Sequence, residues 1–218
     1  MKKIFYILLI IVILDCAFNH SRADTITAKS WLVAENGKIL HGQNTTEVRS
    51  IASITKLMTA MVYLDAHKNP VTKNDRNLLQ RALVSSDNRA AKRLCENYPG
   101  GHGDCIAMMN MKAKELGLVH TKFIEPTGLS VFNTSNAEEL VKIVEAASQY
   151  PEIVEASHTK KHNTNPTIGK YDYTVSKTGF IKASGGCIVA MVNNRIVVIL
   201  GSKNTKTRIP ELETLIRV

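Results

Sequence analysis

The sequence predicts an α/β fold of the α+β type, in which strands from both ends of the chain form one antiparallel sheet and a helical middle packs against it. Two observations support this prediction. Segments with strand character, joined by Asn-Gly or Asn-Asn pairs, lie near both ends of the chain. Between them, apolar residues recur at helical spacing after Ser53 and, in pieces, over about residues 72–157.

The first predicted elements are two short strands and a helix. In ITAKSWLVAENGKILHG, residues 26–42, the pair Asn36-Gly37 is a strong hairpin signal. Ser53 then begins a helix that is expected to end near Pro70. Its apolar positions have helical spacing: Ile54, Leu57, Met58, Met61, Val62 and Leu64.

Four helical pieces are predicted in the middle of the chain. The first covers residues 74–84, the second covers 88–97, and the third ends at Leu116. The fourth begins at SNAE, where Ser135 and Glu138 have the spacing of a capping box.

The end of the chain returns to strands. YDYTVSKTGF, residues 171–180, alternates in part. CIVAMV and RIVVILG are joined by Asn193-Asn194, which can take the left-handed positions of a hairpin turn. IPELETLIRV, residues 209–218, is predicted to be a short closing helix.

The N-terminus has the features of a secretory signal peptide. A basic start is followed by an apolar run over residues 4–14 and by Ser-Arg-Ala at 21–23, a small-x-small cleavage site. The apolar run is too short to span a bilayer, and Asp15 before Cys16 does not suit a lipoprotein site. We therefore expect residues 1–23 to be removed and 24–218 to form one periplasmic catalytic domain without a stable membrane anchor. An uncleaved anchor is the alternative.

The chain is basic, with 28 Lys and Arg against 19 Asp and Glu and a net charge of +9. Such a protein can bind nucleic acid, but no basic run is interleaved with aromatic residues, so no nucleic-acid partner is expected. For an exported chain, anionic polymers of the cell envelope are the better expectation.

Three cysteines follow the predicted signal peptide. Cys95 and Cys105 flank the turn-rich stretch ENYPGGHGD and can close a short disulfide loop in an oxidising compartment. Cys187 lies at the start of a predicted buried strand, where we expect it to pack without reacting.

Three short motifs suggest chemistry: Ser53-x-x-Lys56, Ser86-Asp87-Asn88 and Lys177-Thr178-Gly179. A serine attacks a carbonyl only if a base takes its proton, and Lys56, one helical turn away, can do so if its amine is partly neutral. Burial and a second cation both lower a lysine pKa, and Lys177 is a candidate for that cation.

The other motif residues suit the binding of a peptide. Ser86 can bridge protons between Lys56 and a leaving amine, and Asn88 can orient the substrate. Thr178 can hold a carboxylate, and Gly179 lets a substrate backbone come close to the strand.

These motifs, in this order, are the set found in penicillin-binding proteins and class A β-lactamases. The sequence resembles the low-molecular-mass penicillin-binding proteins of the D-alanyl-D-alanine peptidase family, and most closely the monofunctional DD-endopeptidases, which cut cross-links in peptidoglycan. ASITKLMTAMVYLDA, SSDNRAAKRL, MNMKAKELGLVHTKFIEPTGLSVFNTSNAEEL and SKTGF all resemble this family.

The resemblance implies a penicillin-binding protein/β-lactamase-like fold and a serine acyl-enzyme without metal or cofactor. It implies Ser53 as nucleophile, Lys56 as base and Ser86 as a further catalytic residue. Asn88 and the Lys177–Gly179 motif would bind substrate, and the amide of Phe180 would be an oxyanion donor beside that of Ser53. Peptidoglycan peptides would be the substrate, and β-lactams would be covalent inhibitors.

Two departures from the family bear on specificity. The segment SHTKKHNTNPTIGKYDYTV, residues 157–175, is shorter than expected for the family, and the chain ends soon after the closing helix. The second departure leads us to expect an endopeptidase rather than a tethered carboxypeptidase. A D-alanyl-D-alanine carboxypeptidase, a serine β-lactamase and an inactive wall-peptide binder are the alternatives.

Three further features are interpreted as structural. Glu125 in EPTGL is interpreted as part of a turn, because this stretch lacks the asparagine that would follow a deacylating glutamate within a few residues. His158 and His162 lie in a polar loop and are not expected to bind metal. The methionines at 108, 109 and 111 are expected to fill gaps between helices.

Overall fold

The computed structural model of this chain describes residues 26–67 and 72–218. The predicted signal peptide, residues 1–23, lies outside these residues. Within the described ranges, no helix has both the length and the apolar character that crossing a membrane requires.

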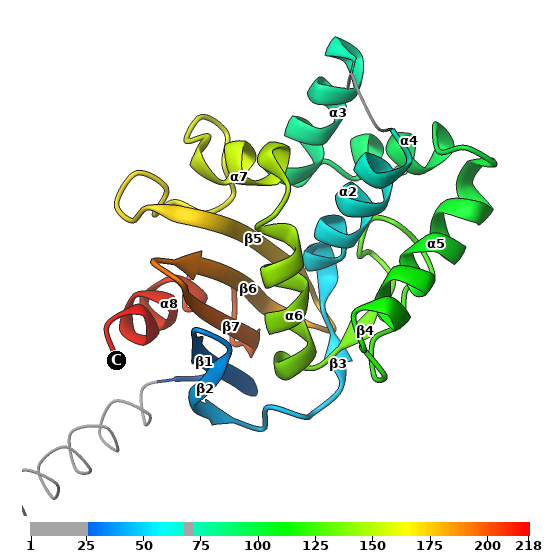
Figure 1. The fold of residues 1–218 in the computed structure, drawn as a ribbon. Coiled ribbons are helices and arrows are strands. Elements are labelled where there is room, and N and C mark those ends of the chain that lie inside the picture. The colour runs from blue at the N-terminus through cyan, green and yellow to red at the C-terminus, as the bar shows by residue number, and fades with distance from the viewer. Residues whose placement is uncertain (1–25, 68–71) are drawn as a thin grey trace, which may run out of the picture.

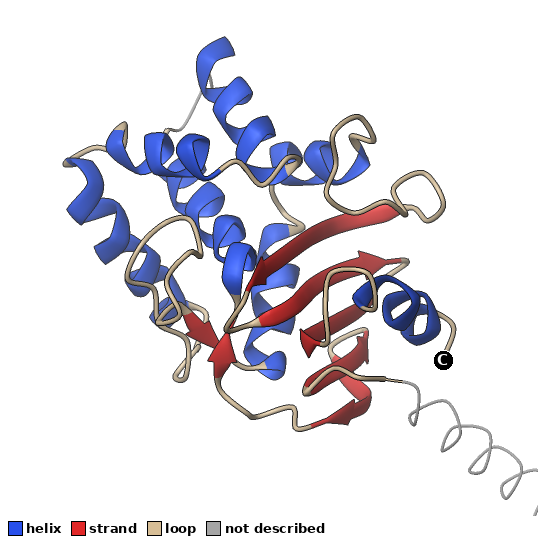
Figure 2. Ribbon diagram, turned by 180° about the vertical axis from the view of Figure 1, so that it is seen from behind, coloured by secondary structure: helices blue, strands red, loops and turns tan. Residues whose placement is uncertain are grey.

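A five-stranded antiparallel sheet with the order β2-β1-β7-β6-β5 forms the centre of the fold (Figures 1 and 2). β1 pairs with β7 from Ser30 opposite Leu200 to Glu35 opposite Arg195. The prediction that the first and last strands share one sheet is therefore confirmed. The strands are β1 Ser30–Glu35, β2 Lys38–Gln43, β5 Tyr173–Ile181, β6 Gly185–Val192 and β7 Arg195–Ser202, and a separate small pair joins β3 Arg49–Ser50 to β4 Thr134–Ser135.

Both predicted hairpin turns are confirmed. Asn36 and Gly37 have φ values of 50° and 75°, and Asn193 and Asn194 have 50° and 64°. Two successive residues with positive φ give the turn that matches the right-handed twist of paired strands. Asparagine and glycine are the residues that reach these angles most easily.

Apart from its exposed edge strand β2, the sheet has a core on each face, and alternate residues of a strand point into opposite cores. Leu32 and Ala34 of β1 belong to the large core beneath the helices, whereas Trp31 and Val33 belong to a smaller core on the other face. The helices from α2 to α7 lie on the side of the large core, and α8 covers the other face (Figures 1 and 2).

The predicted helices are present, with two differences. Residue 53 lies in a short 3₁₀ turn ahead of α2, and an additional helix, α7, begins with Pro151, a residue that suits the first turn of a helix. The helical elements are η1 Ala52–Ile54, α2 Thr55–Ala66, α3 Lys73–Leu83, α4 Asn88–Glu96, α5 Gly101–Glu115, α6 Ala137–Ala147, α7 Pro151–His158 and α8 Arg208–Ile216.

The capping prediction at SNAE was wrong by one residue. Asn136 is the N-cap of α6, and its side chain accepts a hydrogen bond from the N–H of Glu139. Ser135 lies in β4, where its hydroxyl is 2.7 Å from the Thr121 hydroxyl and serves that contact instead. The methionine prediction is right for Met108 and Met109, which pack in the core, and wrong for Met111, which is exposed.

A disulfide joins the end of α4 to the first turns of α5. Cys95 and Cys105 are both fully buried, and their Cα atoms are 5.3 Å apart. Cys187, the free cysteine of the described residues, is buried in β6 as expected. Because α4 begins at Asn88, the disulfide restrains a helix that also carries a predicted site residue.

We expect the Cys95→Ala/Cys105→Ala variant to lose about 2–4 kcal/mol of unfolding free energy, because cross-linking residues ten apart in sequence restricts the unfolded chain. Urea denaturation with and without dithiothreitol measures this. The reductant should lower the stability of the unmodified protein and leave the double variant unchanged. Equal stability of the two proteins under oxidising conditions would contradict the prediction.

Candidate active site

Ser53 lies in the 3₁₀ turn that leads into α2, with its hydroxyl directed at Lys56. The backbone of Ala52 has a positive φ of 46°, and the N–H of Ile51 donates to the carbonyl of Asn133. Lys56, one turn later, donates from Nζ to Ser53 Oγ at 2.9 Å. The spacing in sequence therefore becomes a direct contact between a hydroxyl and an amine.

The Lys56 side chain is fully buried and hydrogen bonded on all sides. Besides Ser53, its Nζ donates to Asn88 Oδ1 at 2.8 Å and to the carbonyl oxygen of Thr127. Three acceptors match the three protons of an ammonium. Burial lowers the pKa of Lys56 to about 8, although the negative charges of Glu125 and Asp87 act in the opposite direction.

Lys177, on β5, is the second buried cation. Its Nζ donates to Ser86 Oγ and to the carbonyl of Thr178, both at 2.9 Å. Burial, then the charge of Lys56, then that of Arg208, hold the pKa of Lys177 well below its usual value. Ser86 has a positive φ of 56° in the turn between α3 and α4.

Two expectations about these lysines need correction. The Ser86 hydroxyl contacts Lys177, and no hydrogen bond joins it to Lys56 among the described residues. The repulsion between the two cations also lowers the pKa of Lys177, whereas burial is what lowers that of Lys56. Nearby carboxylates favour the charged form of Lys56, so the repulsion between the two lysines lowers the pKa of Lys177 instead.

Two glycines let neighbouring segments approach the backbone of Ser53. A Cβ atom on Gly179 would lie 2.9 Å from the Ser53 nitrogen, and one on Gly128 would lie 1.9 Å from the Ala52 oxygen. Gly128 also has a φ of +82°. We expected Gly179 to leave room for a substrate backbone. In the structure it also allows β5 to pack closely against the serine turn.

A cavity of about 250 Å³ opens above the Ser53 hydroxyl. Neither lysine lines it, because both lie beneath its floor. It is lined by Ser53, Ser86, Asn88, Leu129, Thr164, Thr178, Gly179, Phe180 and Arg208. The sequence motifs thus supply most of the lining, and Asn88 is the first residue of α4, where a helix was predicted to begin.

Arg208, Thr164 and Leu129 line this cavity but were not predicted from the sequence. Arg208 at the start of α8 donates from Nη1 to the carbonyl of Gly179 at 2.7 Å. Thr178 donates to the Thr164 hydroxyl at 2.6 Å, which ties the short segment 157–175 to the cavity wall. No local signal marks these residues, because each is brought to the site by an element distant in sequence.

Glu125 organises a loop, as interpreted from the sequence. Its carboxylate accepts hydrogen bonds from the backbone N–H groups of Thr127, Gly128 and Ser130 and from the side chain of Asn133. These contacts place the carbonyl of Thr127 on Lys56. Glu125 therefore acts through the position of the loop.

The histidine pair is arranged differently from the predicted loop. His158 is the last residue of α7, with Nε2 3.0 Å from Asp172, and only His162 lies in a turn. Within residues 26–67 and 72–218, no three His, Cys, Asp or Glu side chains cluster as metal ligands.

The sequence is similar to those of known peptidases. The model of the peptidase S11 family, described as D-alanyl-D-alanine carboxypeptidase, matches residues 17–76 and 71–204. The D-alanyl-D-alanine endopeptidase of Escherichia coli is 37% identical over 227 residues, with 84% of this chain and 73% of the relative covered. That of Pseudomonas aeruginosa is 37% identical over 194 residues, covering 70% and 62%.

The fold also matches a solved structure of a penicillin-binding protein. Penicillin-binding protein D2 from Listeria monocytogenes, in the cefotaxime-bound form, superposes with a TM-score of 0.78 at 25% identity, covering 88% of this chain and 96% of the other. The family model spans most of the described residues, and the sheet, the helical layer and the three motifs fall within it. This chain therefore belongs to the peptidase S11 family of D-alanyl-D-alanine peptidases.

Proposed function

We propose that this chain is a serine DD-endopeptidase that cleaves D-alanyl cross-links in peptidoglycan through an acyl-enzyme at Ser53. The observation that carries the proposal is the buried amine of Lys56, 2.9 Å from Ser53 Oγ at the floor of an open cavity. The relatives described above as D-alanyl-D-alanine endopeptidases support the choice of substrate. No cofactor enters the proposed reaction.

In the proposed first step, neutral Lys56 takes the proton of Ser53 as Oγ bonds to the D-alanyl carbonyl carbon. With one proton gone, the amine has a lone pair that can accept from the Ser53 hydroxyl. The N–H groups of Ser53 and Phe180 would hold the oxyanion. The C–N bond then breaks, and the leaving amine takes the hydroxyl proton of Ser86, which Lys177 replaces through its hydrogen bond and so becomes neutral.

In the proposed second step, water attacks the ester carbonyl and gives one proton through Ser86 to neutral Lys177. As the ester C–O bond breaks, protonated Lys56 returns its proton to Ser53, and the released D-alanyl carboxyl group ionises. Asn88 uses its oxygen to accept from Lys56, which leaves its NH₂ group to donate to a substrate carbonyl. Thr178 and Arg208 line the cavity and suit the carboxylate beside the scissile bond. Lys177 lies beneath them and supports that carboxylate through its charge.

We further propose that residues 1–23 direct export, that residues 24–218 form one catalytic domain, and that the protein acts on the cell wall in the periplasm and so affects cell shape. A D-alanyl-D-alanine carboxypeptidase is the second candidate, favoured by the description of the family. It would use the same residues and differ in the peptide released.

We expect acylation of Ser53 by a labelled penicillin to become about 50-fold faster between pH 6 and pH 8 and to level off above that, because the neutral fraction of a group with pKa about 8 rises by this factor. Rapid-quench gel fluorography at each pH measures the rate. Ser53→Ala should not be labelled at any pH. A rate that does not change with pH would contradict the role of Lys56.

We expect purified cross-linked muropeptide dimers to be converted to monomers, with little free D-alanine released from pentapeptides. Liquid chromatography with mass spectrometry measures both products. Ser53→Ala should be inactive on both substrates, since no other hydroxyl reaches Lys56 among the described residues. Release of D-alanine without loss of dimers would instead identify a carboxypeptidase.

A further inference from the structure

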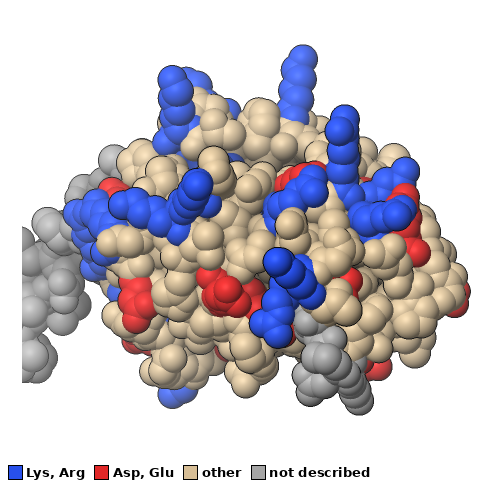
Figure 3. All heavy atoms as spheres, turned by 90° about the horizontal axis from the view of Figure 1, so that it is seen from above, with Lys and Arg blue, Asp and Glu red and all other residues tan. Residues whose placement is uncertain are grey.

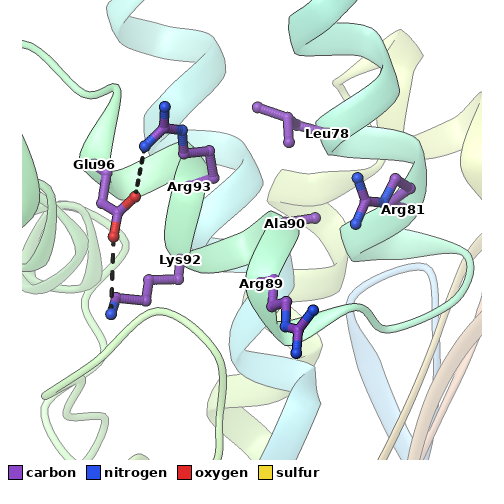
Figure 4. A pocket seen from close by; sticks show the side chains of 7 residues that line it. All are labelled: Leu78, Arg81, Arg89, Ala90, Lys92, Arg93 and Glu96. Atoms are coloured by element: carbon purple, nitrogen blue, oxygen red, sulfur yellow. Dashed lines mark hydrogen bonds and ion pairs between the residues drawn. The ribbon is translucent and has the colours of Figure 1, made fainter.

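A second pocket lies between α3 and α4 (Figure 4), and its lining shares no residue with that of the Ser53 cavity. Its volume is about 420 Å³. Leu78 and Ala90, both almost fully buried, form its apolar part. Four cationic side chains surround them: Arg81, Arg89, Lys92 and Arg93. The residues of this basic pocket play no part in the proposed reaction.

The charges of the basic pocket are only partly neutralised. Glu96 is the one carboxylate in its lining, and it pairs with Arg93 at 3.1 Å and Lys92 at 3.8 Å. Arg81 pairs with Asp87 at 2.5 Å. Arg89 lies between these pairs, and its guanidinium forms no ion pair within the described part of the chain. A ligand that fills this pocket should therefore be anionic.

The positive charge comes from side chains and not from the start of the helix. Asp87 caps α4 by accepting hydrogen bonds from the N–H groups of Arg89 and Ala90, so these amides are already satisfied. Lys and Arg are also conspicuous on the face of the molecule seen from above (Figure 3). Guanidinium groups beside an apolar floor suit a ligand with carboxylates on aliphatic chains.

The position of Arg89 connects this pocket to the cavity of Ser53. Asn88 lines that cavity and Arg89 lines the basic pocket, and the two are consecutive on α4. Successive helical residues point about 100° apart, so the two side chains face adjacent surfaces. An extended peptide advances about 3.3–3.6 Å per residue, so a few residues beyond the scissile bond carry it over the start of α4.

We propose that the basic pocket binds the free carboxylates of a peptidoglycan peptide stem, away from the bond that is cut. This inference rests on the proposed function, because it takes the substrate to be a cross-linked peptide whose glutamate and diamino acid residues carry such carboxylates. The pocket lacks aromatic side chains on which nucleic-acid bases could stack, which argues against a polynucleotide as the occupant. The pocket would then favour long cross-linked substrates over small ones.

The test compares Arg89→Gln/Lys92→Gln with Lys38→Gln/Lys114→Gln, which removes two exposed cations from β2 and α5. Each pair is made in Ser53→Ala protein, which does not turn over, and binding of a muropeptide dimer is measured by isothermal titration calorimetry. We expect Kd to rise about five- to tenfold in the pocket variant, as for loss of two exposed charge contacts, and to stay unchanged in the control.

A chemically altered substrate tests which groups are recognised. When the glutamate and diamino acid carboxylates of the dimer are amidated, Kd should rise by the same factor for Ser53→Ala protein and less than twofold for the pocket variant. In protein with Ser53 intact, the pocket variant should raise KM for dimers, leave kcat unchanged and leave the rate of penicillin acylation unchanged.

Three results would overturn the proposal: an unchanged Kd in the pocket variant, an equal loss in the control, or additive effects of amidation and substitution. An acidic protein segment as the occupant predicts the first of these. Penicillin acylation and dimer cleavage by the unmodified enzyme test the proposed function separately, so a failure of the pocket is distinguishable from a failure of the active site.

Discussion

The Lys56 ammonium is held where water does not reach it, and this constraint governs where the neighbouring segments can lie. Removing a cation from water is costly unless polar groups replace the solvent. Ser53 in the turn before α2, Asn88 at the start of α4 and the carbonyl of Thr127 supply those groups. The burial that lowers the pKa of Lys56 therefore also positions three segments around it.

Close backbone packing completes this arrangement. Gly128 and Gly179 bring the Glu125 loop and β5 against the serine turn from two directions, at distances that exclude a side chain. Glu125 keeps its loop in place by accepting hydrogen bonds from several backbone N–H groups. The glutamate, the two glycines and Lys56 thus stabilise one arrangement, because each of them holds a segment that packs against the segments held by the others.

Helix α4 links the separate parts of the molecule. Its first residue, Asn88, contacts Lys56, the next, Arg89, faces the basic pocket, and Cys95 near its end is bonded to α5. A helix presents these residues on different faces because successive side chains are about 100° apart. By restraining α4, the disulfide can therefore stabilise the position of Asn88, which accepts a hydrogen bond from Lys56, and the position of the cations in the basic pocket.

The sequence by itself determined what depends on local geometry. Asn36-Gly37 and Asn193-Asn194 specify hairpin turns through positive φ, and the spacing of Ser53 and Lys56 specifies one helical turn between hydroxyl and amine. Only the tertiary structure decided that Ser86 contacts Lys177, that Arg208 and Thr164 reach the cavity, and that Arg81 and Arg89 face one pocket. These contacts join elements far apart in the chain, and their distances follow from how sheet and helices pack, which no local pattern records.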